Sequence, residues 1–164
     1  MMKERIRLNQ NGTEKSSKRT LDADGESVLI VCMGNTCRSP MAEAIAHKLL
    51  GEHVHVESAG LETAAGLSAT RHAIEVIREM DLELGHHRSI QFKTVEFQRF
   101  GQVIAMTPRI AELLVEIGVD PARLVQLDIP DPYGRGIEVY RRTAITIEQR
   151  LRAMLCISRT ENEY

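Results

Sequence analysis

Apolar residues from Ser27 onward follow two patterns that alternate along the chain. Apolar runs of strand length lie at 28–31, 103–106 and 124–127, and apolar and polar residues alternate over 54–60. Between these runs, apolar residues are spaced by three or four over 39–50, 70–81 and 108–117, and again from Ile137 to Met154. The short runs are typical of buried strands, and the wider spacing is typical of amphipathic helices.

Strands that alternate with helices predict right-handed crossovers and a parallel sheet. We therefore expect a three-layer α/β fold, with a four-stranded parallel sheet in the order 2-1-3-4 and helices on both faces. Ser39 and Pro40 should open the first helix, whereas Thr107 should cap the third and Gly118 should end it. The residues expected to face inward are Ile110, Leu113, Leu114 and Ile117 on the third helix, and Ile137, Tyr140, Ala144, Ile147, Leu151 and Met154 on the last.

The first 26 residues break this pattern, because charges are dense there and apolar residues are few. We expect residues 1–26 to form a disordered polar extension. The rest of the chain shows no repeat and no linker, and a length of 164 residues suits one domain. The sequence therefore predicts a single domain over residues 27–160.

Composition narrows the classes of function. A net charge of −2, with three Phe, three Tyr and no Trp, argues against a nucleic-acid partner. No apolar run approaches the ~20 residues of a membrane span, and the first residues lack the apolar core of a secretory signal. We expect a cytoplasmic protein with no membrane partner. Three cysteines are an odd number, which argues against a disulfide framework.

The candidate chemistry follows the first strand, in the run Cys32-Met33-Gly34-Asn35-Thr36-Cys37-Arg38-Ser39-Pro40. Ligands of such sheets bind at the carboxyl ends of the strands, and helix N-termini offer free N–H groups to oxyanions. Gly34 and Asn35 tolerate left-handed backbone angles, which lets amides converge on an anion. The Cys32 thiol should ionise readily there, and Arg38 could hold two phosphate oxygens. The run therefore indicates attack on phosphorus with a cysteinyl-phosphate intermediate. No GxxxxGK motif is present, so a nucleotide P-loop is not expected.

The run CMGNTCRSPMAEA, after a buried strand, resembles the loop of the low-molecular-weight protein-tyrosine phosphatase family, and the resemblance extends over roughly residues 27–158. It implies that Cys32 is the nucleophile, Arg38 the oxyanion binder and Ser39 a partner of the thiolate. The loop residues expected to bind the substrate are Met33, Gly34, Asn35, Thr36, Cys37 and Ser39. The expected substrates are phosphorylated proteins or peptides, phosphate-like oxyanions should inhibit, and neither cofactor nor metal is expected. The plain alternative is a structural turn with a buried thiol.

Asp131 is the candidate general acid, because a thiolate alone cannot expel a poor leaving group. It lies between two prolines, which restrict the backbone, in the loop after the fourth strand. The family has an Asp-Pro-aromatic segment at this place, and Asp131-Pro132-Tyr133 matches it. Asp128 is the nearby competitor. Tyr133 then becomes a wall of the substrate cleft, although a plain packing residue is the alternative.

The resemblance also suggests Ser58 and His86 as supporting residues, bound to Asn35. His86 and His87 could instead be surface residues. His53 and His55 could bind a metal, but the sequence shows no third ligand nearby. Cys37 either forms a reversible disulfide with Cys32 or packs in the loop.

Thr36 bears on the substrate. Many tyrosine-specific members have an aliphatic residue before the second cysteine, whereas the bacterial protein-arginine phosphatases have Thr there. A phosphoarginine guanidinium needs hydrogen-bond acceptors, and Thr36 and Asp131 could provide them. We therefore expect phosphoarginine as the substrate, with phosphotyrosine as the alternative. An arsenate reductase would need two further cysteines, which residues 60–110 lack, and a phosphate-binding module would not need Asp131.

Overall fold

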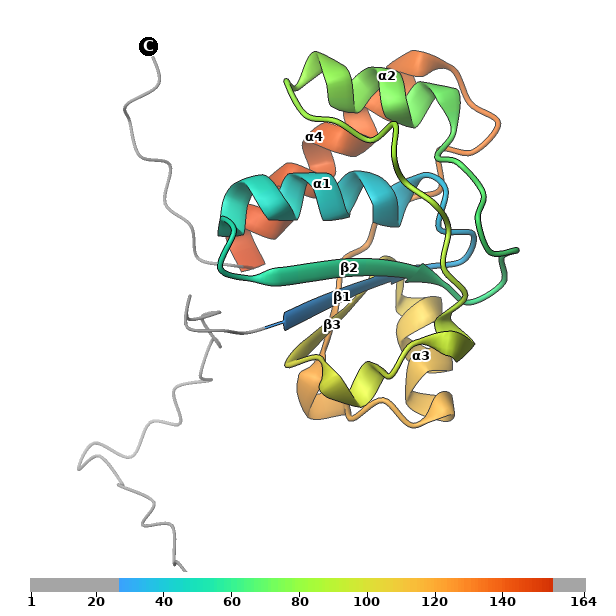
Figure 1. Ribbon diagram of the computed structural model, residues 1–164, viewed down its shortest axis with the longest axis vertical. Coiled ribbons are helices and arrows are strands. Elements are labelled where there is room, and N and C mark those ends of the chain that lie inside the picture. Colours follow the sequence, from blue (N-terminus) through green and yellow to red (C-terminus); the bar gives the residue numbers. More distant parts are fainter. Residues whose placement is uncertain (1–26, 155–164) are drawn as a thin grey trace, which may run out of the picture.

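The computed structural model describes residues 27–154 of the chain, and these form one parallel sheet with helices on both faces (Figure 1). The strands are β1 (Ser27–Cys32), β2 (His55–Gly60), β3 (Gln102–Ala105) and β4 (Leu124–Gln126). Their order is β2-β1-β3-β4 and every pairing is parallel, which confirms the expected fold. The predictions for residues 1–26, and for the end of the domain beyond Met154, lie outside the described residues.

Two layers of helices cover the sheet. The helices are α1 (Arg38–Leu50), α2 (Arg71–Glu79), α3 (Pro108–Ile117) and α4 (Ile137–Met154). Figure 1 shows α1, α2 and α4 together on one face and α3 on the other. Three short 3-10 helices, η1 (Phe92–Thr94), η2 (Phe97–Arg99) and η3 (Pro121–Arg123), lie in the connections. Within residues 27–154, no helix has the length and apolarity that crossing a membrane requires.

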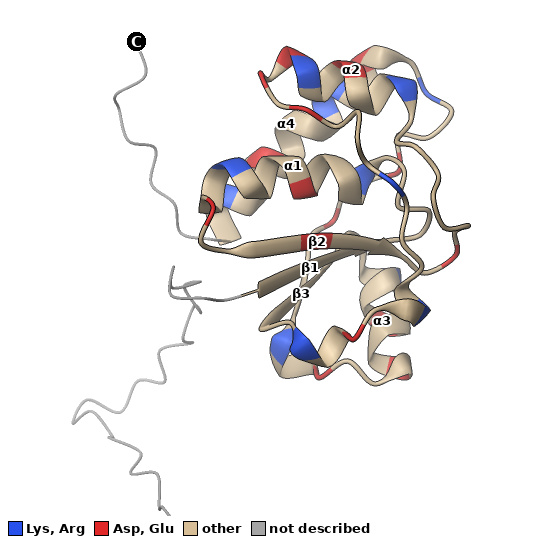
Figure 2. Ribbon diagram, in the orientation of Figure 1, with Lys and Arg blue, Asp and Glu red and all other residues tan. Residues whose placement is uncertain are grey.

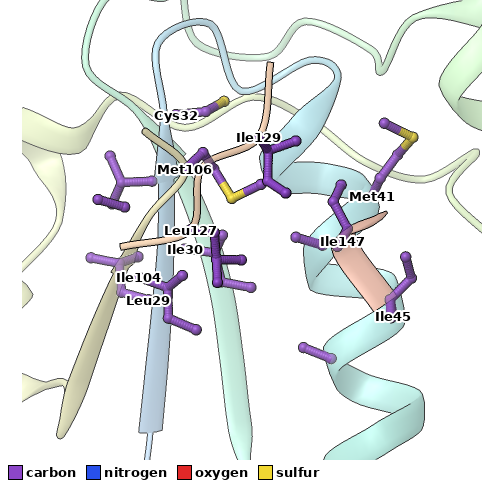
Figure 3. Close-up of a cluster of buried hydrophobic side chains, with 14 of the residues drawn as sticks. Leu29, Ile30, Cys32, Met41, Ile45, Ile104, Met106, Leu127, Ile129 and Ile147 are labelled. Atoms are coloured by element: carbon purple, nitrogen blue, oxygen red, sulfur yellow. The ribbon is translucent and has the colours of Figure 1, made fainter. Parts of the chain in front are cut away.

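The core lies around β1, whose residues Val28–Val31 are fully buried. Side chains of the sheet and of the helices make up this core, among them Ile30 and Ile104 from the strands and Met41 and Ile147 from the helices (Figure 3). Charged residues gather on the helices and loops, whereas β1 and β3 have none (Figure 2). Because burial of a large apolar side chain contributes about 1.5–3 kcal/mol, β1 is held rigidly up to Cys32 at its end.

The end of α3 confirms part of the sequence prediction and corrects part. Thr107 caps the helix by accepting a hydrogen bond from Ile110 N at 3.2 Å, and Gly118 ends it with φ +118°. Ile117 was expected inside but is 51% exposed. The left-handed turn at Gly118 directs Val119 inward instead, where its N–H donates to Leu114 O, and Val119 is buried.

The start of α1 also differs from the prediction. The helix begins at Arg38, its N-cap is Cys37, and no side chain caps it. Ser39 is not the cap, because it lies inside the helix, and its hydroxyl lies 2.8 Å from Cys32 Sγ. The free N–H groups of this first turn are therefore left for another acceptor.

Gly60 sets how closely β2 approaches the loop that follows β1. It pairs with Cys32 in the sheet register. A Cβ at Gly60 would lie 2.8 Å from Met33 O and 3.0 Å from Asn35 Cβ. The loop can occupy its position only because residue 60 has no side chain.

Gly60→Ala should therefore lower the free energy of unfolding by about 1–3 kcal/mol, since the backbone of Met33 must shift. Urea unfolding of the wild type and the variant measures the change. Gly136→Ala is the matched control, because a Cβ there meets no atom within 4 Å. Equal stability of the two variants would show that the contact at Gly60 is not limiting.

Candidate active site

A cavity of about 250 Å³ opens at the carboxyl end of β1. It is lined by Cys32, Met33, Gly34, Asn35, Thr36, Cys37, Arg38, Asp131 and Tyr133. All of these residues were predicted from the sequence as site residues, and the structure brings them together. Ser39, Ser58 and His86, the other predicted residues, do not line the cavity.

The Cys32 thiol is buried and surrounded by hydrogen-bonding groups. Asn35 N donates to Sγ at 3.1 Å, and Ser39 Oγ lies 2.8 Å from it. Asn35 has φ +52°, a left-handed angle that turns its N–H back toward the sulfur. The candidate nucleophile is therefore surrounded by groups that can donate hydrogen bonds to its sulfur.

Asn35 is the centre of the loop and is fully buried. Its Nδ2 donates to Ser39 Oγ and to Ser58 Oγ, each at 2.9 Å. Its Oδ1 accepts a hydrogen bond from Ile90 N at 2.9 Å. The side chain therefore ties α1, β2 and the segment around Ile90 to the loop, and the expected contact with Ser58 is present.

The histidine that contacts Asn35 is His87 and not His86, which corrects the sequence prediction. His87 Nε2 lies 2.7 Å from Asn35 O. His86 is exposed, because it belongs to a turn that closes with His87 N donating to Leu84 O. The chain then continues with exposed Arg88 and with buried Ser89, whose Oγ donates to Ala64 O and accepts from Leu67 N.

Arg38, the first residue of α1, lines the cavity. Its Nη1 donates to Ile129 O at 3.0 Å, and its Nη2 lies 3.6 Å from Asp131 Oδ2. The Arg38 side chain is 7% exposed, whereas that of Asp131 is 56% exposed. The guanidinium is thus a buried positive charge with one solvated carboxylate nearby, which favours the binding of an anion in the cavity.

Asp131 is held by its own turn. Its Oδ1 accepts a hydrogen bond from Tyr133 N at 3.0 Å, as in an Asx turn. Asp128, the competitor, is exposed and does not line the cavity. Tyr133 is 70% exposed at the rim, so its ring is free to contact a bound molecule. The geometry therefore favours Asp131 over Asp128 as the acid.

Cys37 belongs to a cluster that the sequence did not reveal. Its Sγ lies 3.4 Å from Tyr140 OH on α4 and 3.5 Å from Thr70 Oγ1, the N-cap of α2. Burial, together with the hydrogen bond to Cys37, raises the pKa of Tyr140 to about 12. Tyr140 fits the apolar stripe of α4, so its spacing gave no sign of the polar contact. The cluster holds Cys37 between two helices behind the loop.

Two other features lie apart from this cavity. No group of three His, Cys, Asp or Glu side chains within residues 27–154 could hold a metal ion. His55 pairs instead with Glu57 at 2.5 Å. A larger cavity of about 590 Å³ lies between β2 and the segment 94–100. Its charged groups pair with each other, as Arg99 does with Glu96, so it lacks the convergent donors of the smaller cavity.

Comparison with known proteins gives one consistent result. The model of the family described as low molecular weight phosphotyrosine protein phosphatase matches residues 27–163. A protein-arginine-phosphatase of Geobacillus stearothermophilus is 38% identical over 131 residues, which cover 74% of this chain and 88% of that protein. The low molecular weight protein-tyrosine-phosphatase Wzb of Escherichia coli (strain K12) is 32% identical over 134 residues, which cover 77% and 90%. The solved structure of YwlE arginine phosphatase from Geobacillus stearothermophilus superposes with a TM-score of 0.72 at 34% identity, covering 85% of this chain and 98% of that one.

The buried phenol of Tyr140 predicts a loss of stability at alkaline pH. Its pKa is raised to about 12, so the unfolded chain releases this proton first, near pH 10. The stabilisation is complete below about pH 10 and is lost as the pH rises toward 12. Wild type should therefore lose about 1 kcal/mol more than Tyr140→Phe between pH 10 and 11. Urea unfolding of both proteins at the two pH values measures this, and parallel losses would contradict it.

Proposed function

The chain belongs to the low molecular weight phosphotyrosine protein phosphatase family, and we propose that this hydrolase removes phosphate from phosphoarginine in proteins, with Cys32 as the nucleophile. The observation that supports the substrate is Thr36, a hydroxyl side chain in the wall of the cavity. The protein-arginine-phosphatases among its relatives support it as well.

The first chemical step forms a bond between Cys32 Sγ and phosphorus. The P–N bond to the arginine side chain breaks as this bond forms, and Asp131 donates a proton to the leaving nitrogen. The phosphoryl oxygens lie among the loop N–H groups and the Arg38 guanidinium, which stabilise the charge of the transition state. The products of this step are the free arginine side chain and a cysteinyl phosphate.

The second step regenerates the thiolate. Asp131, now ionised, accepts a proton from a water molecule, whose oxygen attacks phosphorus. The S–P bond breaks, the electron pair returns to Cys32 Sγ, and inorganic phosphate is released. Ser39 and Asn35 N, both within 3.1 Å of the sulfur, stabilise the departing thiolate. Phosphate-like oxyanions should inhibit by occupying the same donors.

The choice of substrate depends on acceptors near the leaving group. The phosphoarginine guanidinium presents N–H donors, and the cavity offers Thr36 Oγ1 and the Asp131 carboxylate as acceptors. Phosphotyrosine is the second candidate, because the exposed ring of Tyr133 at the rim could pack on a phenyl ring. The two substrates therefore make opposite demands on residue 36.

Cys32→Ser should abolish turnover, because a serine hydroxyl in this loop is a far weaker nucleophile than a thiolate. Cys37→Ser should retain substantial activity, since its Sγ contacts Tyr140 and Thr70 rather than the phosphate position. The measurement is hydrolysis of a phosphoarginine peptide by the two purified variants and the wild type. An inactive Cys37→Ser beside an active Cys32→Ser would reverse the assignment.

Thr36→Ile tests the substrate. The change removes an acceptor from the guanidinium and leaves a polar group unpaired, which costs about 1–3 kcal/mol, or roughly ten- to a hundredfold in kcat/KM for phosphoarginine. It adds apolar surface next to a phosphotyrosine ring, so kcat/KM for that substrate should hold or rise. Both values are measured at one pH on matched peptides.

The control for this experiment is Thr94→Ile, which makes the same replacement at an exposed position outside the cavity. It should change neither substrate's kcat/KM. A parallel fall with both substrates in Thr36→Ile would mean that Thr36 only shapes the loop. That result would remove the support for phosphoarginine and leave the roles of Cys32, Arg38 and Asp131 intact.

A further inference from the structure

The amide of Asn35 has one allowed orientation. Ile90 N is a backbone donor, and it approaches Asn35 Oδ1 at 2.9 Å. A flipped amide would bring two donors together, so the carbonyl oxygen must face Ile90. The Nδ2 group therefore faces the two serines, Ser39 and Ser58, and donates one hydrogen to each at 2.9 Å.

Counting hydrogens then gives a direction to every remaining bond. A serine hydroxyl has one hydrogen, and each of these hydroxyls already accepts from Asn35. Ser39 must direct its hydrogen to its other partner, Cys32 Sγ at 2.8 Å. Ser58 directs its hydrogen to Glu43 Oε2. The chain of donors thus runs outward from Asn35, to the sulfur on one side and to a carboxylate on the other.

Two residues of this series of hydrogen bonds lie on the same helix, α1. Ser39 and Glu43 are four residues apart on α1, so they lie on one face, one turn apart. The path leaves α1 at Ser39, crosses Asn35 in the loop and Ser58 on β2, and ends on α1 at Glu43. These hydrogen bonds form one polar path behind the cavity, which leaves α1 at Ser39 and returns to it at Glu43.

We infer that Glu43 is a positioning residue, which holds the Ser58 hydroxyl, and through it the Asn35 side-chain amide, so that Ser39 donates to the Cys32 thiolate. A carboxylate oxygen at residue 43 accepts the Ser58 hydrogen and thereby leaves the Ser58 lone pairs to Asn35 Nδ2. Without an acceptor at residue 43, the Ser58 hydrogen has no partner in this path, and the hydroxyl can turn away from Asn35. The Asn35 side-chain amide is then held only by Ile90 N and Ser39, and the hydrogen bond from Ser39 to the thiolate loses its fixed geometry. The inference rests on the proposed role of Cys32.

The direction in which Cys32 reactivity changes when Glu43 is replaced distinguishes a positioning role from a through-space effect of the Glu43 charge. A negative charge near a thiolate disfavours it through space, so removing the Glu43 charge would by that route make Cys32 more reactive. The loss of a directed hydrogen bond makes Cys32 less reactive. The two mechanisms therefore predict opposite changes in the same measurement.

The experiment measures alkylation of Cys32 by iodoacetamide at pH 6 in the full chain, with the modified peptide quantified by mass spectrometry. Iodoacetamide is neutral, so the anion-binding loop does not concentrate it. Glu43→Met, which has no acceptor, should slow alkylation and lower kcat by about three- to tenfold, with a smaller change in KM. Glu43→Gln should fall between Glu43→Met and wild type, because its Oε1 can still accept. Both replacements are good helix formers, so α1 is preserved.

Glu75→Gln and Glu75→Met are the matched controls, since Glu75 is an exposed acid on α2. They should leave the alkylation rate unchanged. The decisive comparison is made in a Ser58→Ala background, where the path from Glu43 is already cut. Glu43→Met should then have no further effect on alkylation or kcat.

Three results would overturn the inference. Faster alkylation in both Glu43 variants would assign a through-space effect. An equal effect of Glu43→Met with and without Ser58 would mean that Glu43 acts by another route. A lower melting temperature with unchanged alkylation would leave only a structural role. Because alkylation reports the thiolate whatever the substrate, these outcomes are independent of whether the enzyme prefers phosphoarginine.

Discussion

The structure depends on bringing several hydrogen-bond donors to one sulfur atom at the end of a buried strand. β1 is anchored in the core and cannot shift, so Cys32 has a fixed position. α1 begins only six residues later, at Arg38, and its first turn has no side-chain cap. The short loop between these two rigid elements must curl, and the left-handed Asn35 lets it do so. The packing of the core and the chemistry of the site are therefore set by the same segment.

The two halves of the site differ in their contact with water. Arg38, Cys32 and Asn35 are buried, whereas Asp131 and Tyr133 lie at the solvent-exposed rim. A buried charge interacts strongly with a bound anion, because little solvent screens it. The exposed carboxylate of Asp131 is in direct contact with solvent, as the proposed proton transfers require. This division suits a reaction in which one group must hold phosphate and another must change its protonation state twice.

The sequence predicted the strand order, the loop and each residue that lines the cavity, because their signals are local. A buried run followed by glycine, cysteine, arginine and a helix start is readable from neighbouring residues alone. The sequence predictions were wrong or incomplete where contacts between distant parts of the chain determine the role of a side chain. Ser39 looked like a helix cap, but its hydroxyl is used by Cys32. His86 and His87 are adjacent in sequence, and only the turn from Leu84 determines which of them faces Asn35. Tyr140 looked like a core residue, and its contact with Cys37 spans 103 positions of the chain.

The polar path between Ser39 and Glu43 has a consequence for the entropy of binding. A free loop would lose backbone and side-chain freedom when it wraps an anion, at about 1–2 kcal/mol for each residue that becomes ordered. Here Asn35, Ser39 and Ser58 are already buried and fixed by their mutual hydrogen bonds. The ordering has taken place during folding of the chain, so the anion meets a loop that is already shaped to receive it. The folded state therefore keeps the loop in the shape that binds a phosphoryl group, and the loop retains this shape between turnovers.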